Sequence, residues 1–223
     1  MDGIAYFIEH SDAIGRAVAL ALLLMSISAW AVILWKARIL RRALRDLHRG
    51  TAAFWDAATI DDGRRRLLGL DRERVLIPLV DAALVGDGTR TLAARGRVDS
   101  QRTRRLRDAL QRSLAHLQSG QVLLASIGST APFVGLFGTV WGIYHALVAI
   151  GGDGAFSIDK VAGPVGEALV MTAAGLAVAI PAVLGYNLFG LWLGRCEAAL
   201  EGFAHDLREL LDDPDALAPA TPA

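Results

Sequence analysis

Three long stretches of the chain consist of apolar residues with almost no charge. Residues 17–35 carry no charge over 19 positions, and residues 113–152 carry none over 40 positions when histidine is counted as neutral. Residues 161–194 contain Glu167 as the one charged side chain among 34 residues. Because a bilayer core about 30 Å thick needs about 20 helical residues, each stretch predicts a transmembrane helix. The second and third helices are long enough to project beyond the membrane.

The distribution of charge around these stretches predicts how the chain crosses the membrane. Basic residues follow the first stretch, and positive charge marks the cytoplasmic side. Residues 36–112 hold 19 lysine and arginine residues against 10 aspartate and glutamate residues, a net charge of +9. We therefore predict that the N-terminus lies outside and the C-terminus in the cytoplasm. The predicted parts are an external N-terminus (1–16), membrane helices (17–35, 121–150 and 161–194), a cytoplasmic helical domain and stalk (36–112), an external loop (151–160), a cytoplasmic helix (195–211) and a disordered tail (212–223).

The polar segments next to the membrane are also predicted to be helical. Glycine-containing turns and Pro78 divide the cytoplasmic segment into helices, and residues 91–150 are predicted to form one long helix. Pro132 and Pro181 each remove a backbone hydrogen bond and predict bends in the second and third membrane helices. Apolar positions at helical spacing extend the third helix through 195–211. The expected fold class is all-α: an integral membrane protein with three transmembrane helices and long cytoplasmic helical extensions.

Two stripes of small residues occur on the second and third membrane helices. In lipid, small side chains let helix backbones approach closely, which supplies the packing energy. Glycine is common in membrane helices in general, but two stripes of matched spacing predict tight packing of these helices against each other or against neighbouring copies. The stripes are Ala131, Gly135, Gly138 and Gly142 on the second helix, and Ala168, Thr172, Gly175 and Ala179 on the third.

Glu167 is the main candidate for a functional site. A carboxyl group inside a membrane costs free energy unless it is paired, hydrated or protonated. Together with Thr139 and Thr172 it could form a narrow polar line that suits protons and offers too few ligands for a metal ion. Two alternatives stay open: Glu167 lies at the level of the lipid headgroups, or each threonine returns its hydrogen bond to its own helix.

Soluble enzyme chemistry and cofactor binding are poorly supported. The five histidines have no metal-ligand spacing, and no phosphate-binding sequence Gly-x-x-x-x-Gly-Lys-Ser/Thr occurs. Cys196 is the only cysteine, and we interpret it as a plain thiol. The basic run at 102–107 is interpreted as a solvated stalk face near anionic lipid, and not as a nucleic-acid site. We therefore expect no metal, no cofactor, no nucleic acid and no enzyme activity.

Two segments resemble the signatures of a known family. Residues 128–143 read GSTAPFVGLFGTVWGI, and residues 167–187 contain EAL, TA, GL, AIPAV and YN in that order. These runs are similar to the second and third membrane helices of the ExbB/TolQ family, which is related to MotA. The three-helix plan resembles ExbB and TolQ more than the four-helix MotA, and the STAPF run is most similar to the ExbB branch.

The resemblance implies an assembly and a mechanism. It implies a homopentamer in the bacterial inner membrane, with the N-terminus in the periplasm, around a dimer of a single-span partner, ExbD or TolR. Protons would pass inward and drive work on TonB or TolA. By motif position, Glu167 corresponds to the pore glutamate of the family, and Thr139 and Thr172 to its pore-lining threonines.

The main hypothesis is therefore a subunit of a motor driven by the proton-motive force, which with an ExbD-like partner energises TonB-dependent transport across the outer membrane. A TolQ-like subunit of the Tol-Pal envelope system keeps the mechanism and changes the client. A non-conducting membrane scaffold is the alternative from a different class, in which the small stripes serve assembly alone.

Overall fold

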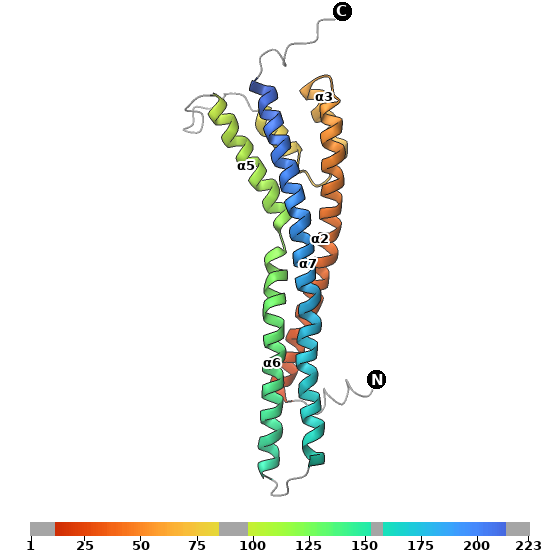
Figure 1. Cartoon of the computed structure of the whole chain (residues 1–223), viewed down its shortest axis with the longest axis vertical. Helices are drawn as coiled ribbons and strands as arrows, with labels where there is room; N and C mark the ends of the chain where they lie inside the picture. Colours follow the sequence, from red (N-terminus) through yellow and green to blue (C-terminus); the bar gives the residue numbers. More distant parts are fainter. Residues whose placement is uncertain (1–11, 85–97, 153–157, 213–223) are drawn as a thin grey trace, which may run out of the picture. The chain divides into compact units, whose positions relative to one another are not determined.

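The computed structural model describes residues 12–84, 98–152 and 158–212, and these residues form six α-helices and no strand (Figure 1). The predicted all-α class is confirmed. Most of the predicted N-terminal segment and nearly all of the predicted disordered tail lie outside the described residues. The helices are α2 (Ala13–Trp55), α3 (Ile60–Leu70), α4 (Ile77–Leu84), α5 (Val98–Gln118), α6 (Gln121–Gly152) and α7 (Ile158–Asp212).

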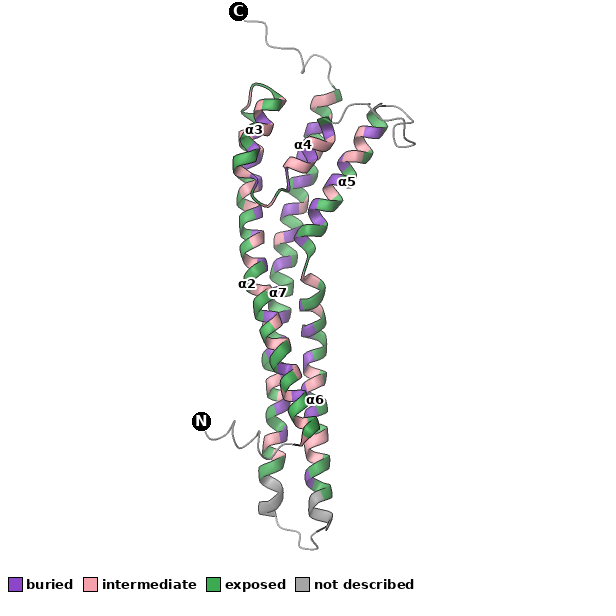
Figure 2. Ribbon diagram, turned by 180° about the vertical axis from the view of Figure 1, so that it is seen from behind, coloured by how far each residue is buried: buried purple, intermediate pink, exposed green. Residues whose placement is uncertain are grey.

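Three helical runs are long and apolar enough to cross a membrane. They are Ala13–Trp55, Asp99–Val148 and Gly163–Asp212, and each contains all or most of one of the three stretches that the sequence singles out. Much of the ribbon of these runs is coloured as exposed (Figure 2). The exposed residues include large apolar ones, among them Leu23, Phe133 and Leu184. Exposed apolar surface on this scale marks contact with lipid or with other protein, so the chain is a multi-pass membrane protein.

The described residues group into two compact units. The first unit consists of 12–35 with Gly120–Leu188, and the second consists of Lys36–Ser119 with 189–212. The first unit therefore contains the most apolar parts of α2 and α7 together with α6. The second unit contains the charged ends of α2 and α7 together with α3, α4 and α5.

The prediction of one helix over 91–150 is wrong, because the chain breaks between α5 and α6. Helix α5 ends at Gln118 and α6 begins at Gln121. Gly120 has a φ of +78°, a left-handed conformation that glycine adopts without a steric penalty. A single glycine at the border of a polar and an apolar helix gives a weak sequence signal, so the break was not anticipated.

Both ends of the segment predicted as an external loop are helical. Helix α6 continues through Gly152 and α7 begins at Ile158, so the predicted loop at 151–160 was too wide at both ends. Glycine disfavours a helix but does not prevent one. Pro132 and Pro181 lie inside uninterrupted helices, and the bends predicted at them stay predictions.

Helix α7 runs without a break from Ile158 to Asp212, over 55 residues. The third membrane helix thus continues through the segment predicted as a cytoplasmic helix. In the second unit its apolar stripe is buried at Leu200, Phe203 and Leu207. Phe203 packs edge-on against Phe54 of α2, with ring centroids 5.2 Å apart.

The loop between α3 and α4 is fixed by one carboxylate. Asp71 is 3% exposed, and its two oxygens accept the backbone N–H groups of Val75, Leu76 and Ile77 at 2.8–2.9 Å. These bonds satisfy donors at the start of α4 that have no helical partner. Pro78 follows within the first turn of α4, where a proline is tolerated.

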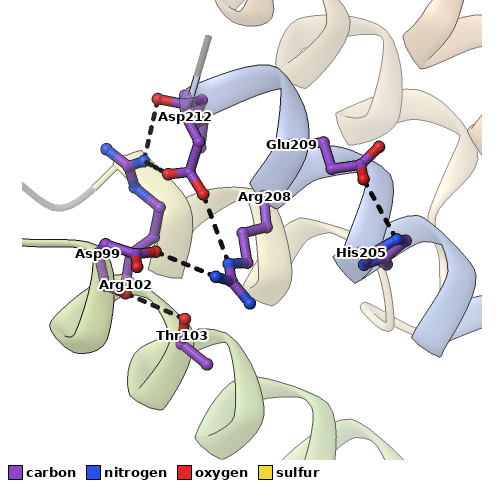
Figure 3. A network of polar contacts seen from close by, with 8 residues as sticks. Asp99, Arg102, Thr103, His205, Arg208, Glu209 and Asp212 are labelled. Carbon is purple, nitrogen blue, oxygen red and sulfur yellow. Dashed lines mark hydrogen bonds and ion pairs between the residues drawn. The ribbon is translucent and has the colours of Figure 1, made fainter.

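Charged side chains join α5 to the end of α7 in the second unit (Figure 3). Arg102 donates to the carbonyl of Leu211 at 3.0 Å and pairs with Asp212 at 2.6 Å. Arg208 pairs with Asp99 at 3.3 Å and with Asp212 at 3.5 Å. Part of the basic run at 102–107 is therefore engaged within the chain.

Candidate functional site

Helices α6 and α7 meet so closely that their backbones touch. A β-carbon at Gly135 would lie 2.6 Å from the carbonyl oxygen of Met171 and 3.1 Å from the α-carbon of Gly175. A β-carbon at Gly175 would lie 2.7 Å from the carbonyl oxygen of Ala131. Real β-carbons do not approach backbone atoms so closely, so only glycine fits at these two positions. We call this contact the α6–α7 seam.

The remaining small residues of both stripes extend the seam. A β-carbon at Gly142 would lie 3.0 Å from that of Ala168. One at Gly138 would lie 3.2 Å from the β-carbon of Met171 and 2.9 Å from a methyl group of Val18 in α2. Ala131, Ala168 and Ala179 are all buried. The structure thus brings the two stripes together within a single chain.

The sequence interpretation omitted Gly128, which belongs to the same seam. A β-carbon there would lie 2.6 Å from a methyl group of Val183. Gly128 precedes Ala131 by three residues and so continues the stripe at helical spacing, a signal that was present in the sequence.

Thr139 and Thr172 form a polar contact inside the seam. Their hydroxyl oxygens are 2.6 Å apart, and Thr139 is 7% exposed. The Thr139 hydroxyl also lies 2.9 Å from the carbonyl oxygen of Ala168 and 3.2 Å from that of Gly135. Since a hydroxyl has one proton, Thr139 donates to one of these carbonyls and can accept the proton of Thr172.

Glu167 lies beside the seam but does not join the threonines. Its side chain is half-buried, and none of the described residues forms a hydrogen bond or ion pair with it. Thr172 follows Glu167 by five residues, which is about 140° around the helix axis at 3.6 residues per turn. Within one chain, the predicted polar line therefore consists of the two threonines, and the carboxyl group points to a different side of α7.

The contacts of α2 locate Glu167 along the seam. Val18, near the start of the first apolar stretch, touches Gly138, and Ala168 touches Gly142. Gly142 is four residues beyond Gly138, about 6 Å along α6. Glu167 thus lies near the level at which the apolar part of α2 begins, and not halfway along it.

Asp12 ties the start of α2 to α6 in the same region. Its carboxylate accepts the indole N–H of Trp141 at 2.5 Å and the backbone N–H of Gly15 at 2.7 Å. The ring of His145 stacks on that of Trp141 at 6.4 Å. Burial raises the pKa of Asp12, but the two hydrogen bonds and the charge of His145 outweigh it, so the pKa lies below the ordinary value of 3.8. The bond from Gly15 makes Asp12 an N-terminal cap of α2, and an aspartate just before an apolar stretch is a sequence signal for such a cap. The bond to Trp141 joins residues 129 positions apart and was not predicted.

These features define a class of protein: a multi-pass α-helical membrane protein in which a half-buried carboxyl group lies next to a glycine-lined helix pair. The chain belongs to the MotA/TolQ/ExbB proton channel family, whose model matches residues 78–201. The matched residues include Thr139, Glu167, Thr172 and both stripes.

Curated relatives cover most of the chain. It is 41% identical over 213 residues to a biopolymer transport protein ExbB from Xanthomonas campestris pv. campestris, an alignment covering 88% of this chain and 81% of the relative. It is 38% identical over 218 residues to an ExbB from Neisseria meningitidis serogroup A, covering 93% of this chain and 96% of the relative. A Tol-Pal system protein TolQ from Haemophilus influenzae is 31% identical over 201 residues, covering 87% of each chain.

Proposed function

We propose that this chain is an ExbB-like subunit of a proton-driven motor that, with an ExbD-like partner, energises TonB-dependent transport across the outer membrane. Membership of a proton channel family and the ExbB relatives at 38–41% identity support this function. The observation that carries it is the half-buried Glu167 carboxyl group, which has no polar partner among the described residues.

A carboxyl group can accept and release a proton, so it can serve as a relay for protons. In this proposal Glu167 passes protons along a hydrated path through the assembly. Moving one charge through the membrane potential supplies about 2.3 kcal/mol per 100 mV. This free energy, released in repeated steps, is the source of the mechanical work.

The threonine pair has a different part in this mechanism. Thr139 is held by backbone carbonyls within the seam, so it fixes the distance between α6 and α7. The half-buried Thr172 hydroxyl can exchange its bond to Thr139 for one to water in a central channel. We expect the polar line to be completed between subunits of the proposed pentamer, because within one chain the Glu167 carboxyl group and Thr172 lie on different sides of α7.

The assembly we propose is a homopentamer in the bacterial inner membrane, with the N-terminus in the periplasm and the C-terminus in the cytoplasm. An ExbD-like single-span dimer occupies the central pore, and a TonB-like protein receives the work. The exposed apolar side chains along α6 and α7 supply the surface for contacts between subunits and with lipid.

Replacing Glu167 by glutamine tests this function, because glutamine keeps the shape and cannot titrate. We expect Glu167→Gln to abolish energised uptake and proton flux through the reconstituted complex, while the protein still reaches the membrane and assembles. Glu201→Gln, at an exposed position of the same helix, is the matched control and should behave like the wild type. Normal uptake by Glu167→Gln would remove this residue from the mechanism and favour the scaffold hypothesis.

The TolQ relative at 31% identity supports a second candidate, a subunit of the Tol-Pal system. The proton-driven mechanism would be the same, and the protein that receives the work would be TolA-like instead of TonB-like. Expression of the chain with its own single-span partner in strains that lack ExbB or TolQ separates the two. Restored TonB-dependent uptake supports the main proposal, and restored resistance to detergent supports the second.

A further inference from the structure

A recess of about 660 Å³ lies in the second unit, between the α3–α4 loop, α4 and α5. It shares no residue with the seam or with Glu167. Its walls carry several charged groups and a small apolar shelf formed by Pro78 and Ala82. The residues that line it are Arg72, Glu73, Arg74, Pro78, Asp81, Ala82, Arg112, Ser113 and His116.

The recess has an excess of positive charge. Its two carboxylates are engaged by arginines from outside it: Asp81 pairs with Arg64 at 2.6 Å, and Glu73 lies 4.0 Å from Arg42. By contrast, the guanidinium groups of the three lining arginines pair with no carboxylate among the described residues. These are Arg72, Arg74 and Arg112. The Nε–H of Arg112 donates to the carbonyl of Asp108 at 3.1 Å, so an anion in the recess would meet the terminal N–H groups of Arg112 and the guanidinium groups of Arg72 and Arg74.

The loop that presents two of these arginines is held in place before any ligand arrives. Asp71 accepts three backbone N–H groups of this loop, as described above, and the Ser113 hydroxyl of α5 donates to the carbonyl of Val75 at 3.3 Å. Arg74 has a φ of +50°, which costs a residue with a β-carbon about 1–2 kcal/mol. Strain of this kind persists only where the surrounding structure imposes it, and it often accompanies binding sites.

The position of the recess along the chain indicates the source of the anion. His116 lies two residues before the end of α5 at Gln118, and Arg112 lies six residues before it. The apolar part of α6 begins directly after Gly120. The recess therefore belongs to the part of the chain next to the border between its charged and apolar segments, where basic residues attract anionic lipid headgroups.

We propose that this recess binds the phosphate group of an anionic phospholipid, with Arg72, Arg74 and Arg112 as its donors. The planar guanidinium group matches phosphate oxygens with two parallel hydrogen bonds. Pro78 and Ala82 face the glycerol and the first carbons of the acyl chains. Basic pockets beside membrane helices recognise lipid headgroups by this chemistry.

The test measures lipid binding to the full assembled complex in nanodiscs, with phosphatidylglycerol and phosphatidylcholine as the probes. We expect the double variant Arg74→Gln, Arg112→Gln to bind phosphatidylglycerol about 10- to 30-fold more weakly, because two basic groups near the surface are lost. Its binding of phosphatidylcholine should not change. The double variant Arg104→Gln, Arg107→Gln is the matched control, since both arginines are exposed on α5 and outside the recess.

Further measurements distinguish an anionic lipid from a soluble anion or an acidic peptide as the ligand of the recess. Arg74→Lys, Arg112→Lys should regain part of the preference for phosphatidylglycerol, which shows that the glutamine variant has not simply misfolded. Inorganic phosphate at the same concentration should not compete, and effective competition would indicate a soluble anion and overturn the lipid assignment. Unchanged phosphatidylglycerol binding in the glutamine variant, or cross-linking of the recess to an acidic peptide of a partner, would also overturn it. None of these readouts depends on proton conduction.

Discussion

Lys36 shows how a side chain of one helix can cap the end of another. It is 1% exposed, and its ammonium group donates to the carbonyl oxygens of Leu117 and Ser119 at 2.7 and 2.8 Å. These carbonyls belong to the last turn of α5 and the residues that follow it, where helical partners are missing. A cation is also favoured there by the helix dipole. Lys36 thus fastens the end of α5 to α2 within the second unit.

Replacing Lys36 by methionine tests this role. Lys36→Met keeps the apolar stem and leaves the two carbonyls unpaired. Since hydrogen bonds to charged groups contribute about 1.5–3 kcal/mol each, we expect a clearly lower midpoint of thermal unfolding in detergent. Arg38→Met, at an exposed position two residues away, should unfold like the wild type. Equal midpoints for the two variants would contradict the capping role of Lys36.

The sequence predicted individual residues unevenly. The apolar setting of Glu167 and the small residues of both stripes were visible as local patterns. The cap by Lys36 joins positions 81 and 83 residues apart in the chain, so no local pattern reveals it. The predicted polar line put Glu167 together with Thr172 without considering their spacing. Five residues along a helix put the two groups on different sides of it.

At the scale of the helices, the length of the apolar stretches and the spacing of small residues were sufficient to predict α6, α7 and their contact. Apolar length predicts a membrane helix because the bilayer sets its minimum. The positions at which helices end depend on caps and turns that involve single residues, such as Gly120. This is why the membrane helices were anticipated and the break between α5 and α6 was not.

The α6–α7 seam predicts which glycines cannot be replaced. In Gly135→Ala or Gly175→Ala, the new methyl group meets backbone atoms of the facing helix, so the helices must separate. We expect destabilisation by about 1–3 kcal/mol and loss of assembled complex. Gly202→Ala on α7, where a β-carbon meets no atom within 4 Å, should be neutral or stabilising by up to about 1 kcal/mol. Thermal unfolding and size-exclusion profiles of the three variants measure this contrast, and equal behaviour would mean that the seam tolerates side chains.

At the scale of the whole molecule, a chain with this much exposed apolar surface needs lipid or other protein around it. The membrane orientation that we propose rests on the basic residues of 36–112. It requires Asp108 on α5 to lie in the cytoplasm and Gly163 on α7 to lie near the periplasmic surface. Both positions are exposed, so single cysteines there can report on the side of the membrane.

Labelling with a membrane-impermeant thiol reagent tests this orientation. The natural thiol is buried at Cys196, which keeps the background low. In cells with a permeabilised outer membrane, we expect Gly163→Cys to be labelled and Asp108→Cys to be protected until the inner membrane is broken. The unmodified chain is the control, and the reverse pattern would invert the proposed topology.

The left-handed turn at Gly120 has a consequence for how this molecule can evolve. Any other residue at that position is disfavoured in the present geometry by about 1–2 kcal/mol, and alanine is favoured over glycine in a continuous helix by about 1 kcal/mol. Both effects favour one continuous helix in place of α5 and α6 when Gly120 is replaced. Glycine at this one position therefore maintains the break between α5 and α6, and selection for the break acts as selection for that residue.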